Sequence, residues 1–204
     1  MKLTRFACVV SIASMLLAGN AFGASVFSDD FNAENGGAGV VNYVAFANWT
    51  VTSGSVDLIG NGYYDFLPGN GLYIDMDGST SQAGTIESIA IPLAAGTYQL
   101  SFDLAGNRRI DTRDQVTAQV NVGPLFAEDF SLPFDAGFTH YVRNFSVASP
   151  TTVSLSFAAI GSDNVGMLLD NVAVAAIPLP AAAWAGVSLM GLLVASKSLR
   201  RRTV

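Results

Sequence analysis

Short segments with alternating apolar and polar residues fill the chain between residues 25 and 176. In the stretch TYQLSFDLAG (97–106), every second residue from Tyr98 to Leu104 is apolar, and the residues between them are polar. The stretch TVSLSFAA (152–159) repeats the pattern with Val153, Leu155 and Phe157. A period of two is typical of a β-strand with one buried face.

Ten segments are predicted as strands, and Gly, Asn, Asp and Ser separate them. They cover residues 26–31, 49–52, 55–59, 72–76, 85–91, 98–104, 116–122, 140–147, 153–157 and 168–174. No helical periodicity competes within this body, so the pattern predicts an all-β fold, an antiparallel β-sandwich of the jelly-roll kind. We expect Trp49 in its core and a ligand at the long loops 32–48 and 60–71.

The two ends of the chain have a different pattern. Lys2 and Arg5 precede an apolar run over residues 6–18, and small residues follow, which predicts a secretory signal peptide over residues 1–24 that signal peptidase and the Sec machinery process. The chain's one cysteine, Cys8, lies inside this leader. The mature protein therefore contains neither disulfides nor a cysteine nucleophile.

At the other end, residues 181–196 are small or apolar and carry no charge. A helix of this length spans about 24 Å, close to the hydrocarbon thickness of about 30 Å. The basic residues that follow are typical of a cytoplasmic membrane stop: Lys197, Arg200, Arg201 and Arg202. We therefore expect a C-terminal transmembrane helix that anchors the body outside the inner membrane until processing.

The residues just before this segment are Ile177, Pro178, Leu179, Pro180 and Ala181. Together with the apolar run and the arginines, they resemble the VPLPA variant of the PEP-CTERM sorting signal. The resemblance implies that an exosortase cuts at this motif and that the body reaches the cell surface or extracellular matrix. It divides the chain into a signal peptide (1–24), a β-sandwich domain (25–176) and a sorting segment (177–204).

The charges of the chain are unevenly distributed. Six of the ten basic residues lie in the end segments, so the body has four against sixteen acidic residues, a formal charge of −12. A surface this negative repels phosphate backbones, which argues against a nucleic-acid partner.

The body also resembles the galactose-binding-like jelly rolls of carbohydrate-binding modules. The stretches that carry the resemblance are FSDDF (27–31), NWTVTSGSVDLIG (48–60), LYIDMDGS (72–79), GTYQLSFDLAGN (96–107) and DNVGMLLDNVAV (163–174). It implies a glycan ligand and a structural calcium ion.

A set of aspartates supplies candidate ligands for calcium. They are Asp29, Asp30, Asp75, Asp77 and Asp170, which converge if the first and last strands are neighbours. The alternative is that they are solvated residues at strand ends.

Aromatic and basic residues supply a candidate glycan site. Tyr63, Tyr64 and Tyr73 cluster around one loop, and Arg108 and Arg109 lie on another. Aromatic rings stack on sugar faces while polar groups donate hydrogen bonds. The alternative is that the tyrosines pack their own loop.

The chain contains no recognisable catalytic motif. Its one histidine, His140, begins a predicted strand, and Glu34, Glu87 and Glu128 lie in no known catalytic setting. We therefore expect no enzyme activity and predict a sorted surface protein that binds glycan, such as exopolysaccharide of a biofilm. A passive matrix protein without a specific ligand is the alternative, and a glycan hydrolase is a remote one.

Overall fold

The computed structural model describes residues 23–80, 82–109, 115–161 and 164–178, and residues 23–177 form one compact unit. Residues 1–22 of the predicted signal peptide and the predicted transmembrane helix lie outside the described residues. So do Leu179, Pro180 and Ala181 of the sorting motif and the predicted membrane-stop residues Lys197, Arg200, Arg201 and Arg202. Within the described ranges no helix is long and apolar enough to cross a bilayer.

Thirteen strands and one short 3-10 turn, η1 (Glu34–Gly37), make up the described part. The strands are β1 (Ser25–Asp29), β2 (Trp49–Ser53), β3 (Asp57–Gly60), β4 (Leu72–Asp75), β5 (Thr85–Ser88), β6 (Ile91–Leu93), β7 (Gly96–Ala105), β8 (Gln115–Val122), β9 (Phe126–Pro133), β10 (Thr139–Val147), β11 (Thr151–Val153), β12 (Leu155–Ile160) and β13 (Leu168–Ile177).

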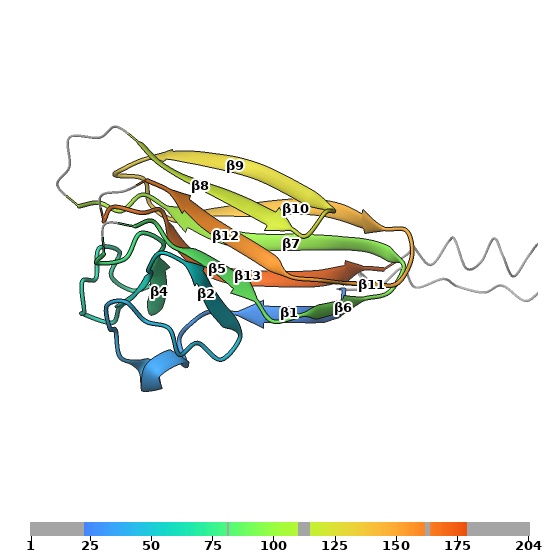
Figure 1. Cartoon of the computed structure of the whole chain (residues 1–204), viewed down its shortest axis with the longest axis horizontal. Coiled ribbons are helices and arrows are strands. Elements are labelled where there is room, and N and C mark those ends of the chain that lie inside the picture. Colours follow the sequence, from blue (N-terminus) through green and yellow to red (C-terminus); the bar gives the residue numbers. More distant parts are fainter. Residues whose placement is uncertain (1–22, 81, 110–114, 162–163, 179–204) are drawn as a thin grey trace, which may run out of the picture. The chain divides into compact units, whose positions relative to one another are not determined.

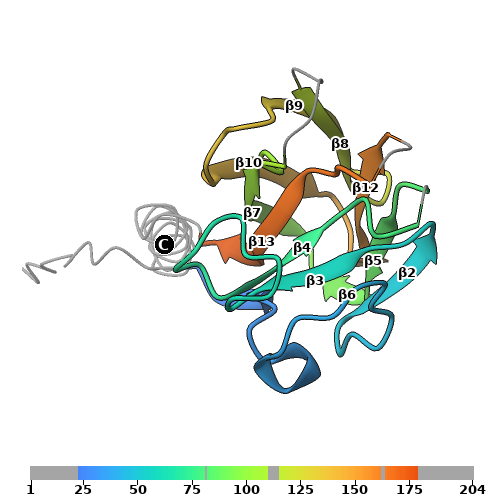
Figure 2. The same ribbon diagram turned by 90° about the vertical axis from the view of Figure 1, so that its left-hand side faces the viewer.

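Two sheets form the sandwich (Figures 1 and 2). One has the order β10-β7-β13-β4-β3, with β1 also paired to β13; the other has the order β2-β5-β12-β8-β9. A short ladder joins β11 to β6, and all the paired strands are antiparallel. The predicted all-β, antiparallel fold is confirmed, and so is the expectation that the first and last strands are neighbours.

Aromatic side chains occupy the centre of the sandwich. Phe102 on β7 packs edge-on against Phe130 and Phe157 of the opposite sheet, with ring centroids 5.3 and 5.4 Å apart. Trp49 is only 3% exposed, which confirms its predicted core position, and its indole Nε1 donates to Asp29 Oδ2 at 3.0 Å. That hydrogen bond satisfies the one polar group of the buried ring.

Strands β6, β9 and β11 were not predicted as separate strands. The predicted strand 85–91 is divided into β5 and β6, because Ser88 Oγ donates to the Ile89 carbonyl and accepts from the Leu155 amide, so that the chain bends and β6 pairs with β11. Strand β9 was not predicted either. It is an edge strand in which Glu128 interrupts the apolar alternation, because Arg143 pairs with that carboxylate.

A second, smaller apolar cluster lies apart from the main core. It consists of Ile59, Leu67, Tyr73, Ala105 and Leu168, with Phe66 and Phe138 packed against it. Loop 61–71, which joins β3 to β4, supplies Leu67 and Phe66. This cluster fixes the loop that carries the two exposed tyrosines.

Candidate functional site

A small pocket of about 70 Å³ forms beside this loop. Its lining comes from β3, loop 61–71, β4 and the segments after β4 and β7: Asp57, Ile59, Tyr64, Phe66, Asp75, Ser79 and Arg109. Two residues of the predicted glycan site, Tyr64 and Arg109, therefore meet in one place, which we call the tyrosine pocket.

The adjacent residues Tyr63 and Tyr64 differ in how firmly they are held. The backbones of Gly60 and Tyr63 exchange two hydrogen bonds of 2.9 Å, which close a tight turn. The Tyr63 ring lies against Gly39, where an added Cβ would come within 2.6 Å of the ring. Tyr64 packs edge-on against Tyr63, with ring centroids 4.9 Å apart, and is 61% exposed. Tyr63 thus supports a ring that Tyr64 presents to solvent.

Tyr64 also has a strained backbone. Its φ is 44°, in the left-handed region that bulky residues seldom adopt. Strain of this kind persists where the surrounding structure enforces it, and it often occurs at ligand sites.

Tyr73 does not belong to the exposed platform, although the sequence suggested that it would. It is fully buried, and its ring packs edge-on against Phe138. Its hydroxyl donates to Asp65 Oδ1 at 3.1 Å and accepts from the Leu67 amide at 3.0 Å, and burial raises its pKa well above the ordinary value. Tyr73 therefore holds loop 61–71 in place and offers no face to a sugar.

The two arginines of the predicted site point to different places. Arg109 lines the pocket and donates from Nη1 to the Asn164 carbonyl, which fixes the guanidinium. Arg108 is exposed, has a positive φ of 57°, and does not line the pocket. Of the two arginines, only Arg109 lines the tyrosine pocket beside Tyr64.

Buried carboxyl groups form the floor of the pocket. Asp75 accepts hydrogen bonds from Asn107 Nδ2 at 2.8 Å, the Asp77 amide at 3.1 Å and the Gly166 amide at 3.2 Å. Burial raises the pKa of Asp75 to about 8, with a further contribution from the charge of Asp57. Asp75 thus clamps three segments together and is occupied by internal donors.

Asp57 plays a similar part on the neighbouring strand. Its Oδ1 accepts from the Asn42 amide at 2.7 Å and the Ser79 amide at 3.1 Å, and its Oδ2 accepts from Ser79 Oγ at 2.7 Å. Sequence reasoning missed Asp57 and Ser79. One indication was available: Asp57 begins a strand, Asp57–Gly60, whose other residues are apolar or glycine and are all buried. A carboxylate in such a strand must accept hydrogen bonds from groups inside the protein.

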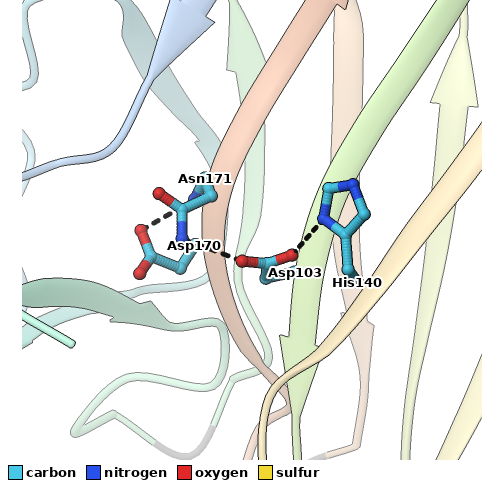
Figure 3. Close-up of polar contacts among 4 residues, drawn as sticks. All are labelled: Asp103, His140, Asp170 and Asn171. Carbon is cyan, nitrogen blue, oxygen red and sulfur yellow. Dashed lines mark hydrogen bonds and ion pairs between the residues drawn. The ribbon is translucent and has the colours of Figure 1, made fainter. Parts of the chain in front are cut away.

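A second polar group lies on β7, β10 and β13 (Figure 3). Asp103 stands between His140 and Asn171: its Oδ1 is 2.6 Å from His140 Nδ1, and its Oδ2 accepts from Asn171 Nδ2 at 2.8 Å. Asn171 has a φ of 50° at a bulge in β13, and its amide donates to Asp170 Oδ1 at 2.7 Å. Burial raises the pKa of Asp170 to about 7, and the charges of Asp103, Asp30 and Asp29 add to the rise.

The aspartates expected to share a calcium ion do not form one group. Asp75 lines the tyrosine pocket and accepts from the Asp77 amide, whereas Asp170 is close to the exposed Asp30. Among the described residues no three Asp, Glu or His side chains gather as metal ligands. The physical reason is that Asp29 and Asp75 already accept hydrogen bonds from protein groups. Binding of calcium itself stays a prediction.

The remaining candidates for catalysis hold structural contacts. Glu34 accepts from the Ala47 amide at 2.9 Å, and Glu128 forms a two-bond ion pair with Arg143, with both N to O distances 2.6 Å. His140 is well exposed, and within the described residues its side chain bonds to Asp103 and to no hydroxyl group. None of these groups forms the nucleophile–base pair of a hydrolase.

No protein-family model matches the chain. Over 152 residues it is 32% identical to halomucin of Haloquadratum walsbyi; the match covers 72% of this chain and 2% of that protein. The chain therefore spans a very small part of the curated relative.

Several solved structures are similar to the chain. One is TmCBM61 in complex with beta-1,4-galactotriose, which matches with a TM-score of 0.48 and 11% sequence identity, over 64% of this chain and 90% of that one. A second is the CBM22-1 xylan-binding domain of Paenibacillus barcinonensis Xyn10C, with a TM-score of 0.49 and 10% identity, over 78% of this chain and 97% of that one. A third is the K3 adhesin domain of Lys-gingipain from Porphyromonas gingivalis, with a TM-score of 0.46 and 16% identity, over 74% of this chain and 98% of that one. With TM-scores below 0.5, these similarities carry no argument about function.

Proposed function

We propose that the protein is an exported, exosortase-sorted surface or matrix protein whose β-sandwich binds a glycan at the tyrosine pocket. The proposal of glycan binding rests on Tyr64, whose ring is exposed and whose backbone is strained, and which lines the same pocket as the fixed guanidinium of Arg109. A sugar ring stacks on the aromatic face, and Arg109 donates hydrogen bonds to its hydroxyl groups. The volume of the pocket is only about 70 Å³, which favours contact with one or two sugar units of a longer polymer over enclosure of a whole small molecule.

The sorting part of the proposal rests on the sequence of the two ends. The basic and apolar leader supports export, and the proline motif from Ile177 to Ala181, followed by an apolar run and arginines, supports exosortase processing. Ile177 is the last residue of β13 and pairs with Thr97, so the proposed motif begins in the sheet itself. Cleavage after it would release a body that has kept all its strands.

Affinity electrophoresis tests the glycan part. Fragment 23–178 and its variants are run through gels that contain neutral or acidic polysaccharides, and retardation is measured. Tyr64→Ala is expected to weaken binding about fivefold to thirtyfold, because the loss of about 1–2 kcal/mol of stacking energy raises the Kd by that factor. Tyr64→Phe keeps the ring and is expected to retain most of the binding.

Val142→Ala is the matched control, because Val142 is 40% exposed on β10, away from the pocket. Equal retardation of wild type and Tyr64→Ala in every gel that retards the wild type would refute the assignment of the pocket. A wild type that no polysaccharide retards would support the passive matrix protein instead.

A further inference from the structure

One end of the sandwich carries no charged side chains. We call it the neutral cap and define it as residues 24–28, 91–98, 119–127, 144–153 and 172–178. None of these segments contains Asp, Glu, Lys, Arg or His, although the body as a whole is strongly acidic. Each segment is contiguous in the sequence, so its neutrality alone says nothing about a surface.

The register of the strands brings four of the segments together, and the Gly123 amide, which donates to the Ser154 carbonyl at 3.1 Å, joins segment 119–127 to the end of segment 144–153. Thr97 pairs with Ile177, Gly96 with Val147, and Ser25 with Ala175, so β7 and β1 begin where β10 and β13 end. Figure 1 shows β6, β11, the start of β7 and the end of β13 together on the right. Because the chain leaves the body at Ile177, the neutral cap surrounds the point of exit.

The nearest charged groups are set back from this end. Arg143 lies four residues before the end of β10, about 13 Å along the strand, and forms an ion pair with Glu128. The exposed carboxylate of Asp129, which accepts from Gln119 Nε2, lies three residues into β9, about 10 Å along that strand. Asp29 is the last residue of β1, four residues or about 13 Å from Ser25. Asp103 and Asp170 lie six and seven residues from Thr97 and Ile177, about 20 Å away along β7 and β13. These carboxyl groups are farther from the exit than the Debye length of about 8 Å at physiological ionic strength.

The surface of the neutral cap also has apolar elements. Val26 and Ile177 are 41% and 36% exposed, and Pro92, Ala94 and Pro150 help to line an open groove of about 420 Å³. Removing such a surface from water costs little free energy, because it contains no charged group that must be desolvated.

We infer that the neutral cap docks on the surface of a lipid bilayer that contains anionic headgroups. The inference rests on the proposed membrane anchor and not on the glycan site. Only residues 178–180 separate Ile177 from the apolar run that begins at Ala181, and three extended residues reach at most about 10 Å. Carboxylates on the cap would lie within a Debye length of the negatively charged surface and be repelled.

Docking in this way also sets the direction of the tyrosine pocket. The pocket lies near Asp75, which pairs with Leu168 at the start of β13, nine residues before Ile177. Nine residues of a strand measure about 30 Å. A docked body therefore presents the tyrosine pocket away from the lipid, toward an extracellular polymer.

A lipid-quenching experiment on the full chain tests the docking. A fluorophore is attached at Ala95→Cys, in the exposed part of the cap, or at Val44→Cys, each in a Cys8→Ser background. Val44 is 70% exposed and follows Asn42, whose amide donates to the pocket residue Asp57. The chain is reconstituted into vesicles of phosphatidylcholine and phosphatidylglycerol with a headgroup-linked nitroxide. We expect strong quenching at residue 95 and little at residue 44.

Charge substitution separates docking from simple tethering. Ala94→Glu is expected to lower the ratio of docked to undocked chains about fivefold in the anionic vesicles, and to change little in phosphatidylcholine alone. Ala94→Gln is the neutral control, and a calorimetric melt confirms that each variant is folded.

The results of these experiments distinguish the membrane anchor from the docking of the neutral cap. Chains that do not float with the vesicles would overturn both the anchor and the docking. Floating chains with equal quenching at residues 95 and 44, or quenching that Ala94→Glu leaves unchanged, would overturn the docking alone. Glycan retardation of fragment 23–178 is independent of all three results.

Discussion

Tyr64 is the residue at which exposure and backbone strain coincide. A ring that is 61% exposed at a φ of 44° gains little from packing, and a left-handed non-glycine residue costs about 1–2 kcal/mol. Natural sequences usually place Gly or Asn at such positions, as this chain does at Asn61 and Gly62. The tyrosine is therefore better explained by a ligand than by stability.

This explanation predicts the effect of Tyr64→Gly. Relief of the backbone strain offsets the loss of the edge contact with Tyr63, worth about 0.5–1.5 kcal/mol, so stability should stay within about 1 kcal/mol of the wild type. Glycan retardation should disappear. Chemical denaturation measures the first effect; a loss of 3 kcal/mol or more would show that Tyr64 is a packing residue.

The raised pKa of Asp170 makes the stability of the folded protein depend on pH. The folded state raises its pKa from 3.8 to about 7, so folding retains a proton that the unfolded chain releases. The stability linked to this group is complete below about pH 4 and is lost as pH rises through about 7. The melting temperature of the wild type should therefore fall relative to Asp170→Asn between these pH values.

Calorimetric melts across that pH range check the prediction. Asp135→Asn, at an exposed position, serves as the control for removing one carboxylate. Parallel melting curves for the wild type and Asp170→Asn at every pH would contradict the raised pKa.

Among the elements, β13 connects most parts of the first sheet. It pairs with β7 along one side and with β4 and β1 on the other, and the bulge between Asp170 and Ala173 lets it change partner. Asn171 stabilises the bulge through its left-handed backbone and its hydrogen bond to Asp103.

Substitution of Asn171 should separate these two contributions. Asn171→Gly keeps the backbone conformation and loses one hydrogen bond, which costs about 1 kcal/mol, whereas Asn171→Ala adds backbone strain and should cost about 2–3 kcal/mol. Urea denaturation gives both values. Equal losses for the two variants would show that the bulge does not require the left-handed residue.

The strands could be predicted from sequence where one face alone is buried. The alternation from Tyr98 to Leu104 and from Val153 to Phe157 matches the buried positions of the inner face. The first segment lies in β7, and the second is divided between β11 and β12 on either side of Ser154. Strand β9 could not be predicted, because Glu128 occupies a position whose ion pair with Arg143 exists only after the sheets have packed.

The candidate site was predictable only in part for a similar reason. Clustering of aromatic residues indicated the loop that lines the pocket, but the burial of Tyr73 depends on contacts with Phe138, which is 65 positions away in the chain. The division of the aspartates into two groups depends on donors such as Asn107 and Asn171, which no spacing along the sequence reveals.

Within the described body, the neutral cap and the tyrosine pocket lie at opposite ends. The neutral cap surrounds the exit of the chain, whereas the tyrosine pocket lies near the start of β13, about 30 Å along the strand. This polarity suits a body held near a membrane, or released from it, while it binds polymer on the far side. A protein that only filled space would not need it.

The most direct test of the glycan assignment is calorimetric melting of fragment 23–178, wild type and Tyr64→Ala, with and without each polysaccharide and calcium. A ligand at a hundred times its Kd stabilises the folded state by about 2.7 kcal/mol, which raises the melting temperature by about 5–10 °C. We predict such a rise for the wild type with at least one polysaccharide, and none for Tyr64→Ala. An equal rise in both proteins, or no rise in either, would contradict glycan binding at the tyrosine pocket.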